Sequence, residues 1–408
     1  MQYALVILDG ASGDAVPEFG GRTSLEESAT PNLDALAQAG MVGLMQNVPP
    51  HMVSGSDVAC LSIMGFDPAL YQVGRGAIEG AALDIDLAPG QVAFRMNLSS
   101  VADGILKSYS TDNLPTADGH ALALELKSAL DDEAFTLYPG ISFRQVLVME
   151  RGTHALGLAY GLPHDNAGLD VSEAFKPKAP PGDTAAQQVA DLLVGYMCAA
   201  NEVLAKSPVN ARRLCEGKLP ANQAWVFWPG MRPGAMRSFQ ESYQKTVALN
   251  SAVDLLVGLA RMTGMRVYRF EGVTDGPTND FAAQAAGAIT MLEDGNEVVI
   301  VHVEAPDAAG HDGCSAEKKR AIEESDRHVL GALREYAKTH PLRIAVMPDH
   351  PTPLSTRKHS HEPVPFVVAG PGIAHNGARR MTEAQAARTG VLIDPGHAFM
   401  GDVFLSGS

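Results

Sequence analysis

The sequence predicts an α/β fold, in which a mostly parallel sheet is flanked by helices and interrupted by a smaller α+β domain. Three observations lead to this class. Short apolar runs rich in β-branched residues end in aspartate. Stretches with apolar residues at helical spacing lie between these runs. A central region instead alternates apolar and polar residues, which is typical of antiparallel hairpins.

Three apolar runs share one design. They are YALVILD, which ends at Asp9, EVVIVHVEAPD, which ends at Asp307, and RIAVMPDH, which ends at Asp349 and His350. A continuous apolar run of this length indicates a parallel strand buried on both faces. Ligands of open α/β sheets bind outside the carboxyl ends of the strands, so three acidic strand ends predict one shared site.

Helical patterns lie between the strands. Residues 30–40 place threonine first, proline next and glycine at the end, which is the usual order of helix signals. Residues 250–265 begin at a polar cap and repeat apolar residues at helical spacing, and the following MRVYRFEG predicts a strand. Residues 315–340 predict a long amphipathic helix that runs into the strand at 343. This alternation favours a layered α/β domain.

The region from 87 to 174 has a different pattern. Alternating segments with turns at ADG and RGT predict hairpins, with one helix at 116–130. The Pro-rich FKPKAPPGDT at 175–184 is interpreted as a connector back to the first domain. We therefore expect one core domain formed by residues 1–86 and 175–408, and a substrate or lid domain inserted at 87–174.

Composition excludes some classes of partner. The 408 residues carry 31 basic and 47 acidic side chains, a formal net charge of −16. Such a chain is a poor candidate for binding nucleic acid or anionic membranes through its overall field, and an anionic substrate would need a local cluster of cations. The four cysteines form no CxxC pair, and no apolar run approaches the roughly 20 residues of a membrane span. These features favour the reducing cytoplasm and leave open whether the chain is a monomer or a homo-oligomer.

A carboxylate and an imidazole recur together at the strand ends. His311 follows Asp307 after small residues, which allow a tight turn and close approach of a ligand. Asp349 and His350 repeat the pair, and a further histidine stands at 359 or 361. Together with Asp9 these side chains would suffice for two metal ions. Mixed nitrogen and oxygen donors suit Zn or Mn better than Mg or Ca, and two-metal sites suit in-line phosphoryl displacement.

Each of these residues taken singly has a simpler interpretation. An aspartate after a strand is usually a helix cap or a turn former, and a lone histidine is more often structural. Ser54 and Ser56 precede an apolar helical run, where serine is commonly an N-cap. The same position also sets a hydroxyl beside the positive end of a helix, which would stabilise an alkoxide or a phosphoserine. The repetition over three strand ends favours a functional site.

Five segments together carry a family resemblance. They are SGSDVACLSIMGFDP (54–68), GRGAIEGAAL (74–83), LPANQAWVFWPG (219–230), APDAAGHDG (305–313) and MPDHPTPLSTRKHSHEPVPF (347–366). Over nearly its whole length the chain resembles the archaeal-type 2,3-bisphosphoglycerate-independent phosphoglycerate mutases of the alkaline phosphatase superfamily. Bacterial relatives of similar length carry a proposed homoserine kinase label. The resemblance implies an alkaline-phosphatase-like core.

The resemblance also implies roles for individual residues. Ser56, in the Gly-Ser-Asp motif, would be the nucleophile and form a phosphoserine. Two divalent ions are implied, with Mn and Zn favoured and Mg and Co left open. One ion would be held by Asp9, Ser56, Asp349 and His350, and the other by Asp307, His311 and His359. His359 stands four positions before Pro-Val-Pro, while His361, where the family usually has a small residue, could compete.

The inserted domain of the family supplies cations for the carboxylate and phosphate of the substrate. The resemblance makes Arg75, Arg95 and Arg144 the candidates here, because a planar guanidinium binds such anions through two hydrogen bonds. His164 and Lys218 are further candidates. Any one of these cations taken singly is more often a surface charge. Cys60 stands where the family commonly has asparagine, and we expect it to pack without taking part in chemistry.

The activity implied by the resemblance is that of a glycolytic isomerase, which moves the phosphoryl group between 3-phosphoglycerate and 2-phosphoglycerate. Two other functions stay open from the residues themselves. One is a phosphotransferase or phosphohydrolase acting on another small phosphorylated acid or on homoserine. The other is a metal-binding regulatory protein that has lost catalysis. The nucleotide-binding motif GxxxxGK[ST] does not occur in the sequence.

Overall fold

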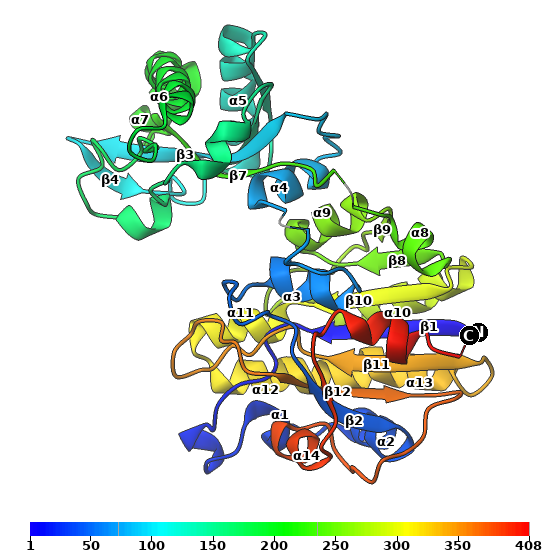
Figure 1. Ribbon diagram of the computed structural model, residues 1–408. Helices are drawn as coiled ribbons and strands as arrows, with labels where there is room; N and C mark the ends of the chain where they lie inside the picture. The colour runs from blue at the N-terminus through cyan, green and yellow to red at the C-terminus, as the bar shows by residue number, and fades with distance from the viewer. Residues whose placement is uncertain (72, 235, 408) are drawn as a thin grey trace. The chain divides into compact units, whose positions relative to one another are not determined.

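The computed structural model describes residues 1–71, 73–234 and 236–407 and divides the chain into two compact units (Figure 1). Unit 1 comprises Met1–Gln72 together with Met236–Ser408, and unit 2 comprises Val73–Ala235. The chain therefore leaves its first unit once and returns to it once, as expected for an insertion.

Unit 1 is built around an eight-stranded sheet. In spatial order its strands are β13 (Leu392–Ile393), β2 (Met41–Met45), β12 (Val364–Ala369), β11 (Leu342–Met347), β1 (Gln2–Leu8), β10 (Val298–Val303), β8 (Val247–Asn250) and β9 (Arg266–Tyr268). Within this sheet β12 pairs antiparallel with both of its neighbours, and the other pairs of strands are parallel. The expected mostly parallel sheet is thus confirmed.

The register of the three central strands aligns their carboxyl ends. Strand β1 lies between β10 and β11, with Leu8 opposite Val303 and Ile7 opposite Met347. The residues that follow these strands therefore emerge at one edge of the sheet. This is the physical basis for a shared site at acidic strand ends.

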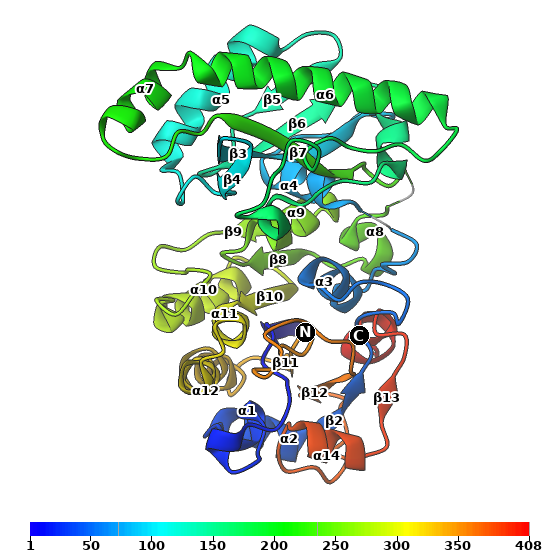
Figure 2. The ribbon, with the colours of Figure 1, turned by 90° about the vertical axis from the view of Figure 1, so that its left-hand side faces the viewer.

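Helices cover both faces of this sheet (Figure 2). The α-helices of unit 1 are α1 (Ser24–Glu27), α2 (Pro31–Ala39), α3 (Ser56–Ile63), α8 (Phe239–Tyr243), α9 (Asp254–Met262), α10 (Phe281–Glu293), α11 (Ala305–Asp312), α12 (Ser315–Glu324), α13 (Gly331–Tyr336) and α14 (Glu383–Arg388). On one face, side chains of β1 such as Val6 pack with Leu33 of α2 and Met291 of α10. On the other, the ring of Tyr3 lies edge-on to that of Phe404, with centroids 5.5 Å apart. Alternate side chains of each strand thus enter two separate core layers.

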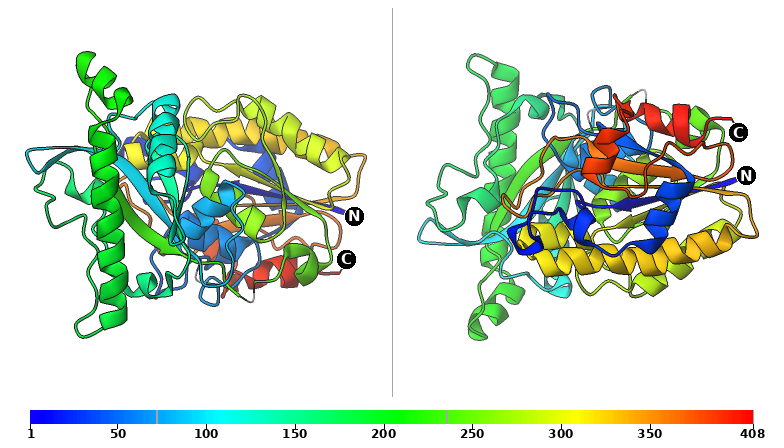
Figure 3. Two further views of the ribbon diagram at one scale, coloured as in Figure 1. Left: turned by 90° about the horizontal axis from the view of Figure 1, so that it is seen from above. Right: turned by 90° about the horizontal axis from the view of Figure 1, so that it is seen from below.

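Three shorter helical turns complete unit 1: a 3-10 helix at Pro17–Phe19 and π-helices at Ser325–Leu330 and Met400–Phe404. The first π-helix joins α12 to α13. The long helix predicted at 315–340 is therefore one continuous helical rod from Ser315 to Tyr336, which the right panel of Figure 3 shows beside the sheet.

Unit 2 has its own antiparallel sheet and its own core. Its elements are α4 (Arg75–Ala82), β3 (Val92–Ala102), β4 (Ile105–Ser108), α5 (Thr116–Leu130), β5 (Phe135–Tyr138), β6 (Arg144–Met149), α6 (Thr184–Ala205), α7 (Pro208–Cys215), β7 (Gln223–Gly230) and 3-10 turns at Thr153–Gly157 and Pro163–Asn166. Helices α5 and α6 pack on one face, where Leu126 and Leu193 meet Phe94. Helix α4 packs on the other, where Ala77 meets Ala93 and Val146.

The expected bounds of the inserted domain, 87–174, are too narrow. Strand β7 pairs with β3 along its length, so residues 223–230 belong to the sheet of unit 2. The stretch 175–184, interpreted as a connector back, instead leads into α6, which buries Leu193 and Met197 in the same core. The 22-residue helix and the distant strand therefore lie outside the predicted bounds, because sequence order does not reveal such pairing.

Helix α9 also differs slightly from the predicted helix 250–265, because Asn250 ends β8 and the helix begins at Asp254. Within the described ranges, no helix combines the length and the apolar composition needed to span a membrane.

Candidate metal centre

The predicted site residues of unit 1 gather at the aligned strand ends. Asp9 directly follows β1, Asp349 and His350 follow β11, and Asp307 lies in the first turn of α11, just after β10. Gly10 makes this convergence sterically feasible. Its φ is +59°, and a Cβ there would lie 2.4 Å from Asp307 Oδ1, so a side chain at this position would displace the carboxylate.

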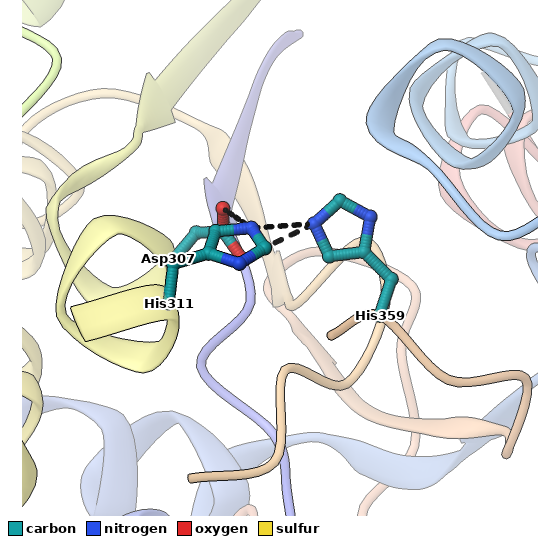
Figure 4. Close-up of side chains that lie close together, drawn as sticks. All are labelled: Asp307, His311 and His359. Carbon is teal, nitrogen blue, oxygen red and sulfur yellow. Dashed lines mark hydrogen bonds and ion pairs between the residues drawn. The ribbon is translucent and has the colours of Figure 1, made fainter. Parts of the chain in front are cut away.

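A first set of ligand-type side chains, which we term the Asp307 group, consists of Asp307, His311 and His359. His311 Nε2 lies 3.1 Å from Asp307 Oδ2 and 2.9 Å from His359 Nε2. His359 Nε2 lies 3.7 Å from Asp307 Oδ1. Figure 4 shows the three side chains turned toward one another, with two coming from α11 and one from the loop before β12.

The Ala-Ala-Gly segment between Asp307 and His311 forms helix rather than the tight turn that we expected. Residues four apart on an α-helix lie on the same face, so α11 itself aligns the carboxylate with the imidazole. The His311 Nδ1–H donates to the carbonyl oxygen of Arg357 at 2.9 Å. This hydrogen bond orients the ring so that Nε2 faces the group.

His361, the alternative to His359, has a different environment. Its Nε2 lies 2.8 Å from the carbonyl oxygen of Met52 and its side chain is exposed. His359, by contrast, stacks on His350 with ring centroids 3.8 Å apart. The geometry therefore favours the register in which His359 belongs to the Asp307 group.

The second set, which we term the Asp9 group, consists of Asp9, Asp349 and His350. All three side chains are completely buried. His350 Nε2 lies 3.2 Å from Asp349 Oδ2 and 3.8 Å from Asp9 Oδ1. The backbone N–H groups of Gly10 and His350 donate to Asp349 Oδ1, which fixes the orientation of this carboxylate.

Ser56 adds a hydroxyl to the Asp9 group. Its Oγ lies 3.1 Å from His350 Nε2, the same nitrogen that faces both carboxylates. Ser56 is the first residue of α3, and the N-cap is Gly55, with an extended φ of −174°. The interpretation of Ser56 as an ordinary N-cap is therefore wrong, and its hydroxyl points at the buried histidine instead.

The chemistry of the Asp9 group fits a divalent cation. Asp9 Oδ1 is fully buried, and it accepts no hydrogen bond from the part of the chain that the structure describes. Burial raises the pKa of Asp9 well above its ordinary value, and the carboxylates of Asp349, Glu304 and Asp307 add to the shift. A buried concentration of negative charge with an unpaired oxygen is stabilised when a cation binds it.

The Asp307 group fits a cation by a different balance of charges. Burial opposes ionisation of Asp307, but the hydrogen bond from His311 and the nearby imidazole of His359 hold its pKa well below the ordinary value. The hydrogen bond to Asp307 raises the pKa of His311 to about 9. A proton therefore occupies the position between carboxylate and imidazole that a metal ion would take.

The protonation of His311 leads to a prediction for how stability and Mn²⁺ affinity of the ion-free chain depend on pH. The folded pKa of His311 lies above its ordinary 6.5, so the interaction stabilises the fold below pH 6.5 and is lost as pH rises through about 9. We expect the unfolding free energy to fall over this range and the affinity of the Asp307 group for Mn²⁺ to rise. Thermal unfolding and Mn²⁺ titration of chelator-treated protein would check this, and a pH-independent affinity would contradict it.

Several residues at this site were not singled out from the sequence for a role in it. Thr352 connects the two groups, because its Oγ1 donates to Asp307 Oδ1 at 2.5 Å and lies 3.3 Å from His350 Nδ1. Cys60, expected only to pack, is fully buried with its Sγ 3.7 Å from Asp349 Oδ2. His302 and Glu304 form a third cluster with Asp9. The sequence feature that could have indicated this last pair is a histidine, His302, within an otherwise apolar strand.

The candidate cations lie in unit 2, and three of them surround one aromatic ring. The Cζ atoms of Arg75 and Arg95 lie 4.4 and 5.5 Å from the ring centroid of Trp228, and the His164 ring lies 5.6 Å from it. Arg95 Nη1 also donates to Glu79 Oε1 at 2.9 Å. Two guanidinium groups and one imidazole thus gather at one aromatic residue, and Glu79 Oε1 also lies 3.5 Å from Arg75 Nε.

The remaining two candidates have other neighbours. Arg144 begins β6, and its Cζ lies 6.0 Å from the ring centroid of Phe143, which Arg95 also faces at 5.9 Å. Lys218 is exposed and pairs with Glu216 at 2.7 Å. The structure thus links Arg144 to the cluster through Phe143 and gives Lys218 an ion pair of its own.

Comparisons with known proteins agree on one family. A family model described as 2,3-bisphosphoglycerate-independent phosphoglycerate mutase matches residues 37–210. The enzyme of that name from Methanosarcina barkeri is 37% identical over 394 residues, covering 96% of each chain. The solved PH0037 protein of Pyrococcus horikoshii is 29% identical, with a TM-score of 0.81 and coverage of 98% of this chain and 95% of that one.

A second solved structure extends the likeness in fold. The cofactor-independent phosphoglycerate mutase of Thermoplasma acidophilum is 24% identical, covers 99% of this chain and 98% of its own, and has a TM-score of 0.69. Near-complete coverage in both directions means that both units of the chain, and not the sheet of unit 1 alone, have counterparts in these proteins. The chain, with two groups of ligand-type side chains and a serine beside the buried one, belongs to the family of 2,3-bisphosphoglycerate-independent phosphoglycerate mutases.

Proposed function

We propose that the chain interconverts 3-phosphoglycerate and 2-phosphoglycerate, with Ser56 carrying the phosphoryl group between the two hydroxyls of the substrate. The observation that carries this proposal is the 3.1 Å separation of Ser56 Oγ from His350 Nε2 inside a buried group of ligand-type side chains. A serine in that environment can give up its proton more readily than one in water.

Two divalent ions are proposed to bind at the two ligand groups. The Asp9 group together with Ser56 would hold one ion, and the Asp307 group would hold the other. When bound, such ions lower the pKa of a hydroxyl and neutralise the charge of a transferring phosphoryl group. The mixed imidazole and carboxylate donors favour Mn or Zn, with Mg and Co as weaker alternatives.

The proposed reaction consists of two successive displacements at phosphorus. In the first, a bond forms between Ser56 Oγ and phosphorus while the bond from phosphorus to the substrate oxygen breaks. The proton of the serine hydroxyl passes to the departing oxygen, which leaves as the glycerate hydroxyl. In the second, a bond forms between the other glycerate hydroxyl oxygen and phosphorus while the bond from phosphorus to Ser56 Oγ breaks, and the proton of the attacking hydroxyl passes to Ser56 Oγ.

Unit 2 is proposed to act as the substrate-binding lid, with bounds of 73–235 in place of 87–174. A phosphoserine must be kept from water, because water would convert the mutase into a phosphatase. The cations around Trp228 support a role in binding the carboxylate and phosphate of the substrate, since guanidinium groups match both anions. A small phosphorylated acid is the partner that such a cluster suits, and the cytoplasm remains the expected compartment.

Arg75 gives a direct test of this cation cluster. We expect Arg75→Met to raise the KM for 3-phosphoglycerate by roughly 10- to 100-fold, the effect of losing one charge-assisted hydrogen bond. Arg75 is suitable because its side chain is 39% exposed and thus accessible to an anion, with its Nε 3.5 Å from Glu79 Oε1. Arg232→Met is the matched control, since Arg232 is exposed and pairs with Asp86. An unchanged KM in Arg75→Met would exclude Arg75 from substrate binding.

The activity itself is tested with purified, Mn-loaded protein and 3-phosphoglycerate, in the absence of 2,3-bisphosphoglycerate. We expect 2-phosphoglycerate to appear and free phosphate to stay at background. Free phosphate alone would indicate a phosphohydrolase. If neither 2-phosphoglycerate nor free phosphate forms, the proposed substrate is contradicted. The search would then turn to homoserine and other small phosphorylated acids.

A further inference from the structure

A buried histidine connects the Asp9 group to a second layer of residues. His302 lies on β10 and its side chain is completely buried. Both ring nitrogens have partners. Nδ1 lies 3.0 Å from Ser251 Oγ, and Nε2 lies 2.7 Å from Asp9 Oδ2. Ser251 directly follows β8, Asp9 directly follows β1, and His302 lies near the end of β10. Because these three strands are neighbours in the sheet, the sheet itself sets the spacing of the three side chains.

The direction of each hydrogen bond follows from the other partners. Ser251 Oγ accepts a hydrogen bond from the N–H of Val253 at 3.0 Å, and His302 Nδ1, also at 3.0 Å, is the acceptor that the described residues offer to its own hydrogen. With Nδ1 accepting, the neutral ring carries its hydrogen on Nε2. Nε2–H then donates to Asp9 Oδ2, which lies 2.7 Å away. The chain of hydrogen bonds therefore runs from Ser251 through His302 to Asp9.

This series of hydrogen bonds gives the two carboxylate oxygens of Asp9 different roles. Oδ2 is held by His302, while Oδ1 is buried without a hydrogen-bond partner among the described residues and lies 3.8 Å from His350 Nε2. We propose that Ser251 and His302 are positioning residues, which fix the Asp9 carboxylate so that Oδ1 is presented to a divalent ion. The inference rests on the proposed function in one respect, that Asp9 binds an ion.

A rival arrangement uses the same atoms. Asp9, His302 and Glu304 lie close enough to hold a third cation. Glu304 Oε2 is 3.7 Å from His302 Nε2, whereas Asp9 Oδ2 is at hydrogen-bond distance, 2.7 Å. A cation between His302 and Asp9 would require Nε2 without its hydrogen, which the donation from Ser251 disfavours. The positioning role is therefore the better account of these distances.

The test compares two substitutions of His302 by Mn²⁺ binding. His302→Gln keeps an N–H donor near the position of Nε2, and His302→Leu fills similar space without one. Both are made in the His359→Ala background, which leaves the Asp9 group as the principal site, and Mn²⁺ affinity is measured by equilibrium dialysis. We expect His302→Leu to weaken Mn²⁺ binding by roughly 10- to 100-fold, and His302→Gln to restore most of it.

Ser251→Ala is the second variant, and it keeps the test decisive if His302→Leu fails to fold. It should weaken Mn²⁺ binding in the same direction but less, because His302 retains its contact with Asp9. Near-parental affinity in His302→Leu, or equal losses in His302→Gln and His302→Leu, would overturn the positioning role. Three ions per wild-type chain, falling to two in His302→Leu, would overturn it in favour of a third metal site.

Metal binding is measured without turnover, so the two proposals can fail separately. The variants could show the expected differences in Mn²⁺ affinity while the wild-type chain forms no 2-phosphoglycerate. That result would support the positioning role and refute the proposed reaction. Conversely, the wild-type chain could form 2-phosphoglycerate while substitution of His302 in the His359→Ala background left the Mn²⁺ affinity unchanged. That result would support the reaction and refute the positioning role.

Discussion

Replacing Ser56 with alanine is expected to lower turnover of 3-phosphoglycerate by more than about three orders of magnitude, as removal of a nucleophile does elsewhere. Ser56 begins α3, and its Oγ faces His350 Nε2 at 3.1 Å. The substitution removes the oxygen proposed to accept the phosphoryl group and little else. Binding of an ion to the Asp307 group should persist, because Ser56 is not among its members.

Ser54→Ala is the matched control for this experiment. The Ser54 hydroxyl donates to the carbonyl oxygen of Ser360 at 2.7 Å, so its loss should cost about 1 kcal/mol of stability and leave the chemistry intact. Formation of 2-phosphoglycerate and Mn²⁺ content are measured for both variants and for the wild type. If Ser56→Ala kept wild-type turnover, the phosphoserine would have no place in the mechanism.

Replacing His359 with alanine is expected to remove one of two bound ions and, with it, turnover. His359 Nε2 lies 2.9 Å from His311 Nε2 and 3.7 Å from Asp307 Oδ1, so the substitution deletes one of three converging donors. The loss of affinity should exceed the roughly 10- to 100-fold that removing an outer-layer partner costs, because a direct ligand is lost. The Asp9 group keeps all its members and should still bind its ion.

His361→Ala is the control, since it removes a histidine two residues away whose ring instead approaches the carbonyl oxygen of Met52. Metal content after exhaustive dialysis against a chelator and reloading with Mn²⁺ gives the ion count for each variant. We expect two ions in His361→Ala and one in His359→Ala. The reverse result would mean that the ligand register is shifted by two residues.

Much of the site could be predicted from sequence because its members are tied to secondary structure. An apolar run that ends in an acid places that acid at a strand end, and parallel strands bring their ends to one edge. Asp9, Asp307 and Asp349 were found in this way. The five motif segments supplied Ser56 and the choice of His359, and the family that they predicted is confirmed by the comparisons.

Contacts between distant segments could not be predicted in this way. Ser251, His302 and Asp9 are separated by 51 and 293 positions, and they meet because β8, β10 and β1 are neighbours in the sheet. Thr352 joins the two ligand groups through its hydroxyl, and nothing in its local sequence distinguishes it from a turn residue. The antiparallel direction of β12 is likewise set by pairing partners rather than by its own residues.

The sequence by itself determined the class of the main sheet, the acids at its strand ends and the family, because these depend on local periodicity and short motifs. Only the tertiary structure decided the bounds of the second unit, where β7 returns to pair with β3 after α6 and α7. It also decided which oxygen of Asp9 accepts no hydrogen bond from the described residues, because His302 Nε2 lies 2.7 Å from the other one. Local patterns fix what an element is, whereas pairing and burial between elements fix which atoms of the site remain available to a ligand.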